Sequence, residues 1–184
     1  MILAKNLTCH RPPKNFIFEE IYFFQESETL TAGHEPCVFE HPDHPQLKIG
    51  LAICYDLRFP ELSAIMGQRG ADVIFFPASF NATTGPLHYD LLGRARALDN
   101  QAYVALCAPA RNFEDKGGYQ GWGHSTIING SGLIEAQAEL RERLIVHEMD
   151  LEGLEFQRQG MPYATQKRDD VYRILDLTQE KENN

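Results

Sequence analysis

The chain has 184 residues, of which 43% are hydrophobic and 23% charged, and its formal net charge is -9. This length and hydrophobic content suit one ordinary globular domain with a buried core. The acidic balance argues against a nucleic-acid partner, because proteins that bind the phosphate backbone concentrate Lys and Arg on one face. We therefore expect an acidic domain with no nucleic-acid partner.

The cysteine content and the first residues bear on the compartment. Neither the paired spacing of a zinc site nor the density of a disulfide scaffold is present among Cys9, Cys37, Cys54 and Cys107. Reduced thiols in the cytoplasm are the expectation, with the mitochondrion as the alternative compartment. The apolar run at the start is far too short for a signal peptide or a membrane span, so no membrane partner is expected.

The first part of the chain carries few structural signals. Residues 1–23 differ from the rest, because the segment 11–14, Arg-Pro-Pro-Lys, breaks any regular element. Turn residues then flank a short strand predicted near Val38 and Phe39. Residues 48–53 mix β-branched and small apolar side chains over the length of a buried strand.

A strand, helix, strand pattern follows from residue 48 onward. Residues 60–70 carry apolar side chains at helical spacing between a proline and a glycine, and residues 72–77 are a compact β-branched and aromatic strand. A second helix is predicted over 86–100 and a strand over 102–108. Because such units need crossover connections within a parallel or mixed sheet, the predicted fold class is α/β.

The last third of the chain predicts three features. Residues 123–134 indicate a hairpin, since Asn129-Gly-Ser-Gly132 supplies residues that tolerate positive φ. Residues 143–149 predict a final strand, and the remainder predicts a polar tail.

Cys54 lies where the strand pattern stops and shortly before the helix pattern begins. Such an elbow presents a side chain outside the sheet and offers the next backbone N–H, that of Tyr55, to a developing oxyanion. Cys54 is therefore a candidate nucleophile, and a small buried hydrophobic residue is the alternative. Arg58, four residues on, offers a planar fork for a substrate carboxylate, or else pairs with Asp56 or Glu61 as scaffolding.

Several segments together resemble a known enzyme family. The nucleophile segment is Gly50-Leu-Ala-Ile-Cys54-Tyr-Asp-Leu-Arg58-Phe-Pro-Glu61, and Phe80-Asn-Ala-Thr-Thr-Gly-Pro, Pro109-Ala-Arg and Gly123-His-Ser-Thr follow it. These segments resemble the nitrilase superfamily of carbon–nitrogen hydrolases, and its omega-amidase branch most closely. The resemblance covers roughly residues 24–176.

The resemblance implies a fold, a domain division and further site residues. The implied fold is an α-β-β-α sandwich without its early strand and helix, formed by residues 24–184 after a divergent segment 1–23 and doubled across a homodimer interface. Glu26 matches the glutamate that orients the family's site, and Phe80 and Thr84 match residues that line its substrate pocket. The implied chemistry requires no cofactor and no metal.

The implied function is hydrolysis of the terminal amide of small dicarboxylate monoamides, such as 2-oxoglutaramate and 2-oxosuccinamate, through a cysteine thioester. The family's general-base glutamate and its lysine motif are not recognisable here, which predicts a shortened or divergent member. A catalytically inactive relative that binds a ligand or oligomerises is therefore the first alternative. An amidase for deaminated glutathione is the second.

Overall fold

A mixed β-sheet forms the centre of the computed structural model, which describes residues 33–115 and 117–179. In those residues the sheet has six strands, arranged side by side in chain order. The strands are β1 (Cys37–His41), β2 (His44–Leu51), β3 (Val73–Pro77), β4 (Tyr103–Cys107), β5 (Thr126–Ile128) and β6 (Ile134–Gln137). The predicted domain boundary after residue 23 lies outside the described residues.

The strand directions follow from the lengths of the connections. Short turns join β1 to β2 and β5 to β6, and both pairs are antiparallel. Helix-containing connections join β2 to β3 and β3 to β4, and both pairs are parallel, as crossover connections require. The pairing of β4 with β5 is antiparallel again. The predicted hairpin over 123–134 thus corresponds to β5, β6 and the Asn129–Gly132 turn between them.

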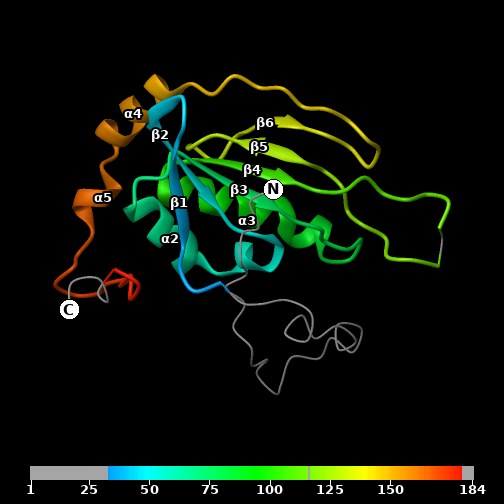
Figure 1. The fold of residues 1–184 in the computed structure, drawn as a ribbon, viewed down its shortest axis with the longest axis horizontal. Helices are drawn as coiled ribbons and strands as arrows, with labels where there is room; N and C mark the ends of the chain where they lie inside the picture. The colour runs from blue at the N-terminus through cyan, green and yellow to red at the C-terminus, as the bar shows by residue number, and fades with distance from the viewer. Residues whose placement is uncertain (1–32, 116, 180–184) are drawn as a thin grey trace, which may run out of the picture.

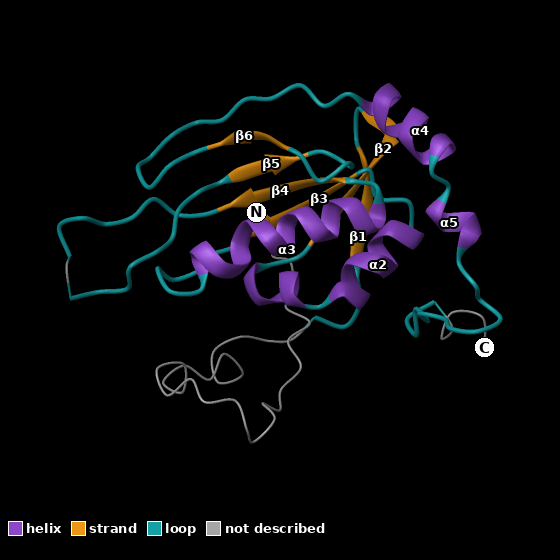
Figure 2. Cartoon of the chain, turned by 180° about the vertical axis from the view of Figure 1, so that it is seen from behind, coloured by secondary structure: helices purple, strands orange, loops and turns teal. Residues whose placement is uncertain are grey.

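Two helices lie on one face of the sheet, as Figure 2 shows. Helix α2 (Pro60–Gln68) follows a short 3₁₀ helix, η1 (Cys54–Arg58), and helix α3 (Gly85–Asn100) connects β3 to β4. Both helices occur where the sequence predicts them. Their inner faces pack with the sheet into a core that includes Leu57, Met66, Ile74, Phe76 and Tyr89. This sheet with its helices has the predicted α/β class, and the described residues provide one helix layer and one sheet layer.

The opposite face of the sheet carries a smaller apolar cluster around Val73, Tyr103 and Leu154. Residues 143–149 run over this face and are not a strand, so the prediction of a strand there is wrong. Their side chains alternate between half-buried and exposed positions from 144 to 149, as in a strand, but their backbone joins no ladder of the sheet described above. A hollow of about 270 Å³ remains between this segment and the sheet.

The predicted polar tail contains two helices, α4 (Leu151–Gly160) and α5 (Tyr163–Gln166). The Asp150 side chain accepts a hydrogen bond of 2.8 Å from the N–H of Gly153 and so caps α4. Within α4, Leu154 is the buried residue, and Arg158 forms an ion pair of 2.8 Å with Asp72. These tertiary contacts hold a helix whose composition is mostly polar.

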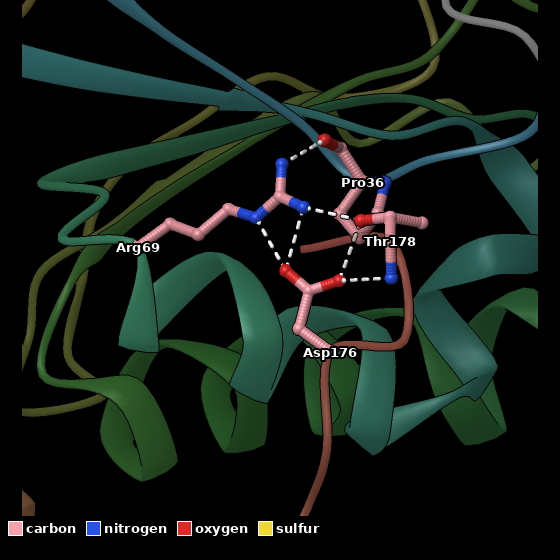
Figure 3. Close-up of polar contacts among 4 residues, drawn as sticks. All are labelled: Pro36, Arg69, Asp176 and Thr178. Atoms are coloured by element: carbon pink, nitrogen blue, oxygen red, sulfur yellow. Dashed lines mark hydrogen bonds and ion pairs between the residues drawn. The ribbon is translucent and has the colours of Figure 1, made fainter. Parts of the chain in front are cut away.

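The C-terminal segment is fastened to the sheet and to α2 by Arg69 (Figure 3). Its guanidinium donates to Asp176 Oδ2 at 2.7 Å, to Thr178 Oγ1 at 2.7 Å and to the carbonyl of Pro36 at 2.8 Å. One side chain therefore joins the end of α2, the residue before β1 and the C-terminal segment. Among the described residues, no helix is both long enough and apolar enough to cross a membrane.

Candidate functional site

Cys54 begins η1, three residues after the end of β2 at Leu51, and has a φ of 39°. Positive φ is uncommon for a residue with a Cβ and stores strain that the surrounding structure must hold. The buried Asp56 side chain contributes, because its Oδ2 accepts a hydrogen bond of 3.0 Å from the N–H of Ile53. The expected elbow is present, and its backbone has the sharp turn that lifts a nucleophile out of a sheet.

The thiol of Cys54 is half-buried and faces the loop that follows β3. Its Sγ lies 3.8 Å from the carbonyl oxygen of Ser79, and the same oxygen accepts a hydrogen bond of 2.9 Å from the hydroxyl of Tyr119. Burial raises the pKa of Tyr119, the hydrogen bond to Ser79 lowers it in part, and the nearby Cys54 raises it. Tyr119 therefore stays a protonated donor at neutral pH.

Tyr55 is the second residue of η1, and its side chain is half exposed. The first N–H groups of a helix lack acceptors within the helix, so the Tyr55 amide can donate to an oxyanion that forms beside the Cys54 sulfur.

Arg58, at the end of η1, lies close to two aromatic rings. Its Cζ is 5.2 Å from the centre of the Tyr55 ring and 4.9 Å from that of the Phe80 ring. Its Nη1 lies 3.3 Å from Nδ1 of His88, a residue of α3. Over residues 33–115 and 117–179 it forms no ion pair, so the alternative that it pairs with Asp56 or Glu61 is not seen.

Phe80 and Thr84 differ in how they face the site. Phe80 is buried and stacks edge-on against Tyr89 at 5.3 Å, so it forms a rigid wall beside Arg58. The Thr84 hydroxyl donates a hydrogen bond of 2.9 Å to Asn81 Oδ1, which also accepts from the Thr84 N–H. Thr84 therefore closes the turn before α3, and its oxygen retains capacity only as an acceptor.

The structure brings five of the six expected site residues into two adjoining segments, η1 and the loop after β3. Glu26 lies outside the described residues. Two further residues, Tyr119 and His88, contact this region and were missed. The sequence marks both only weakly: a histidine with no motif around it, such as His88, is usually structural, and Tyr119 stands in no catalytic pattern.

Within residues 33–115 and 117–179 no group of three His, Cys, Asp or Glu side chains is placed to hold a metal ion. The hollow on the opposite face of the sheet is lined by other residues, such as Phe75 and Ile145, and by none of the candidate site residues.

Curated proteins match most of the length of this chain. "Omega-amidase, chloroplastic" from Arabidopsis thaliana is 47% identical over 154 residues, which are 84% of this chain and 40% of that protein. "Omega-amidase NIT2" from Homo sapiens is 46% identical over 151 residues, 82% of this chain and 53% of that protein. The chain therefore spans about half the length of these curated relatives or less.

Solved structures share the fold. The Saccharomyces cerevisiae protein Nit3, a member of branch 10 of the nitrilase superfamily, is 43% identical with a TM-score of 0.70, over 78% of this chain and 51% of that one. The C. elegans NitFhit protein is 37% identical with a TM-score of 0.73, over 82% of this chain and 36% of that one. The carbon-nitrogen hydrolase family matches residues 10–159. The chain is thus a member of the carbon-nitrogen hydrolase family, within the nitrilase superfamily.

Proposed function

We propose that the chain is an amidase that cleaves small amides carrying a second, carboxylate end, with Cys54 as its nucleophile. The observation that carries this proposal is the strained elbow at Cys54, whose φ is 39°, in the same short helix as an arginine that forms no ion pair in the described residues. The elbow presents the cysteine sulfur as a nucleophile, and the guanidinium of the arginine can bind the carboxylate of a substrate.

The proposed reaction has two steps. The Cys54 sulfur attacks the amide carbon, the carbonyl oxygen becomes an oxyanion at the Tyr55 N–H, and the carbon–nitrogen bond breaks as the nitrogen takes up a proton and leaves as ammonia. Water then attacks the thioester, releases the carboxylic acid and returns the proton to sulfur. Glu26 is proposed to orient the reacting groups, and Phe80 and Thr84 to shape the pocket.

Arg58 is proposed to bind the distal carboxylate of the substrate. The guanidinium lies beside the Tyr55 and Phe80 rings, and its two parallel N–H donors match the two oxygens of a carboxylate. Small monoamides of dicarboxylic acids, such as 2-oxoglutaramate and 2-oxosuccinamate, have the required end groups. The naming of two relatives as omega-amidases supports this substrate class.

The test is ammonia release from 2-oxoglutaramate by the purified chain and two cysteine variants. Cys54→Ala is expected to remove the activity, because no other group of the elbow can form the thioester. Cys107→Ala is the matched control, since this exposed thiol lies outside the site, and it is expected to keep the activity. Equal ammonia release by the wild-type chain and Cys54→Ala would overturn the proposal.

A second candidate is a catalytically inactive relative that keeps the carboxylate site and binds a ligand or oligomerises. One observation favours it: the family's general-base glutamate and lysine are not recognisable in this sequence. A positioned general base contributes on the order of 10²–10⁴-fold, so a chain without one would show very little turnover. Ligand binding without ammonia release from 2-oxoglutaramate or deaminated glutathione would support this candidate.

We also propose that the chain acts as a homodimer in a reducing compartment, the cytoplasm or the mitochondrion. Leu87 and Leu91 lie one turn apart on α3 and are 63% and 65% exposed, which suits a surface that another copy covers. The free cysteines of the structure support a reducing compartment. Light scattering of the purified chain tests the dimer, and a monomer at micromolar concentration would contradict it.

A further inference from the structure

The guanidinium of Arg58 has one hydrogen-bond partner in the described part of the chain, the imidazole of His88. The two residues are 30 positions apart and come from different elements, η1 and α3. Two aromatic rings lie beside the guanidinium, with their centres 5.2 and 4.9 Å from its Cζ, and His88 contacts one of its nitrogens. Rings alone permit the guanidinium to rotate in its plane, whereas a hydrogen bond at one edge sets its direction.

The chemistry of this contact determines the state of His88. Arginine has five N–H donors, no acceptor, and is always protonated. Nδ1 of His88 must therefore supply the lone pair, which places the imidazole in its neutral form with its proton on Nε2. A neutral partner orients the guanidinium and leaves its positive charge uncompensated. A carboxylate partner would cancel that charge and compete with an anionic substrate.

Helix α3 also holds the backbone of the same residue. Arg96 donates from Nε to the carbonyl of Leu57 at 3.1 Å and from Nη2 to the carbonyl of Arg58 at 3.4 Å. The helix therefore contacts Arg58 twice, at its carbonyl through Arg96 and at its guanidinium through His88. Such double support is what a precisely directed binding group requires.

We propose that His88 is a positioning residue that directs the Arg58 guanidinium and thereby makes the site selective for ligands with a carboxylate. This inference rests on the proposed function in its choice of ligand. It adds a residue that would not touch the substrate and acts only through Arg58.

The experiment measures how glutarate, a five-carbon dicarboxylate, protects Cys54 from alkylation by iodoacetamide. The alkylation rate at Cys54 is followed by mass spectrometry of its peptide, and the exposed Cys107 serves as an internal reference. The glutarate concentration that halves the rate reports binding at the site. Because no turnover is needed, the measurement remains valid even when ammonia release is absent.

Two substitutions at position 88 separate positioning from mere packing. His88→Leu removes the acceptor and should raise the half-protecting glutarate concentration about tenfold, the loss expected for one charge-assisted hydrogen bond. His88→Asn places an amide oxygen near the position of Nδ1 and should keep that concentration within about threefold of the wild-type value. Protection by the neutral diamide glutaramide should change in neither variant.

The double variant decides whether His88 acts through Arg58. Arg58→Met should weaken protection strongly, and adding His88→Leu should then have no further effect. The positioning role is overturned if His88→Leu weakens protection as much in the Arg58→Met chain as in the wild-type chain. It is also overturned if Arg58→Met weakens protection and His88→Leu alone does not. If Arg58→Met itself has no effect, the carboxylate role of Arg58 fails with it. Ammonia release that is absent while the His88 effects hold would count against the proposed function alone.

Discussion

At Cys54 the chain adopts a backbone conformation that a residue with a Cβ avoids, with a φ of 39°. The left-handed region costs such a residue roughly 1–2 kcal/mol relative to glycine. Neighbouring contacts sustain the conformation, because Asp56 accepts from the Ile53 N–H and Arg96 holds the carbonyl of Leu57. The strain is therefore a property of this position, and it persists for any side chain that has a Cβ.

The first prediction concerns this strain. Cys54→Gly should be more stable than Cys54→Ala by about 1 kcal/mol, because only glycine adopts positive φ without penalty. Urea unfolding of both variants measures the difference. The same pair of substitutions at Cys107, the last residue of β4, provides the control, since there alanine should be the more stable. A Cys54→Ala variant more stable than Cys54→Gly would contradict the strain.

At the scale of elements, the sequence predicts a helix or strand correctly where the segment itself carries the starting residue or the apolar spacing that the element needs. Helix α2 begins at a proline, and α3 has apolar spacing over many turns, so both were predictable. Residues 143–149 have the alternation of a strand, yet a strand needs a partner backbone that local sequence does not reveal. Helix α4 was missed because only Leu154 is buried, although Asp150 is a capping residue that could have indicated it.

At the start of α3, the backbone of Gly85 packs closely against the side chain of Trp122. A Cβ added at Gly85 would lie 2.2 Å from Cγ of Trp122. The Trp122 indole stacks on the His124 ring at 4.1 Å. The backbone N–H of Trp122 donates a hydrogen bond of 2.7 Å to the carbonyl of Phe80. The glycine is thus needed for close approach, and any displacement of Trp122 is passed to the loop that carries Phe80.

The second prediction follows from this approach. Gly85→Ala should lower the free energy of unfolding by about 3 kcal/mol, because the indole or the helix must move to relieve the overlap. Gly160→Ala is the matched control, since its Cβ would meet nothing within 4 Å at the end of α4. It should be neutral or stabilising by up to about 1 kcal/mol. Thermal unfolding of both variants checks the pair, and a Gly85→Ala variant as stable as Gly160→Ala would contradict it.

At the scale of the whole molecule, contacts between distant segments complete what the sequence leaves open. The sequence placed Cys54, Tyr55 and Arg58 at one elbow because of their local pattern, and the family resemblance added Phe80 to them. It could not predict that His88 would face Arg58, since that contact depends on how α3 lies against η1. The same holds for Arg69, whose partner Asp176 is 107 residues away.

The Arg69 contacts make the attachment of the C-terminal segment depend on pH. Burial alone would raise the pKa of Asp176, but hydrogen bonds from Thr178 and Arg69 outweigh it and hold the pKa below its ordinary value. The Asp176 side chain is only 10% exposed, so water screens this ion pair little. A carboxyl whose pKa is depressed in the folded state stabilises that state when it is ionised.

The third prediction is the pH range of this stabilisation. Asp176→Asn should unfold more easily than the wild-type chain above a pH of about 4, the ordinary carboxyl pKa, and the difference should vanish as the pH falls through the lower pKa of the folded state. Asp170→Asn is the control, because its ion pair with Arg168 is 64% and 67% exposed and should contribute nothing measurable at any pH. Urea unfolding across this range provides the measurement. The prediction would be contradicted if the difference in stability between the wild-type chain and Asp176→Asn stayed constant into the acid range. The stabilisation would then not depend on the charge of Asp176.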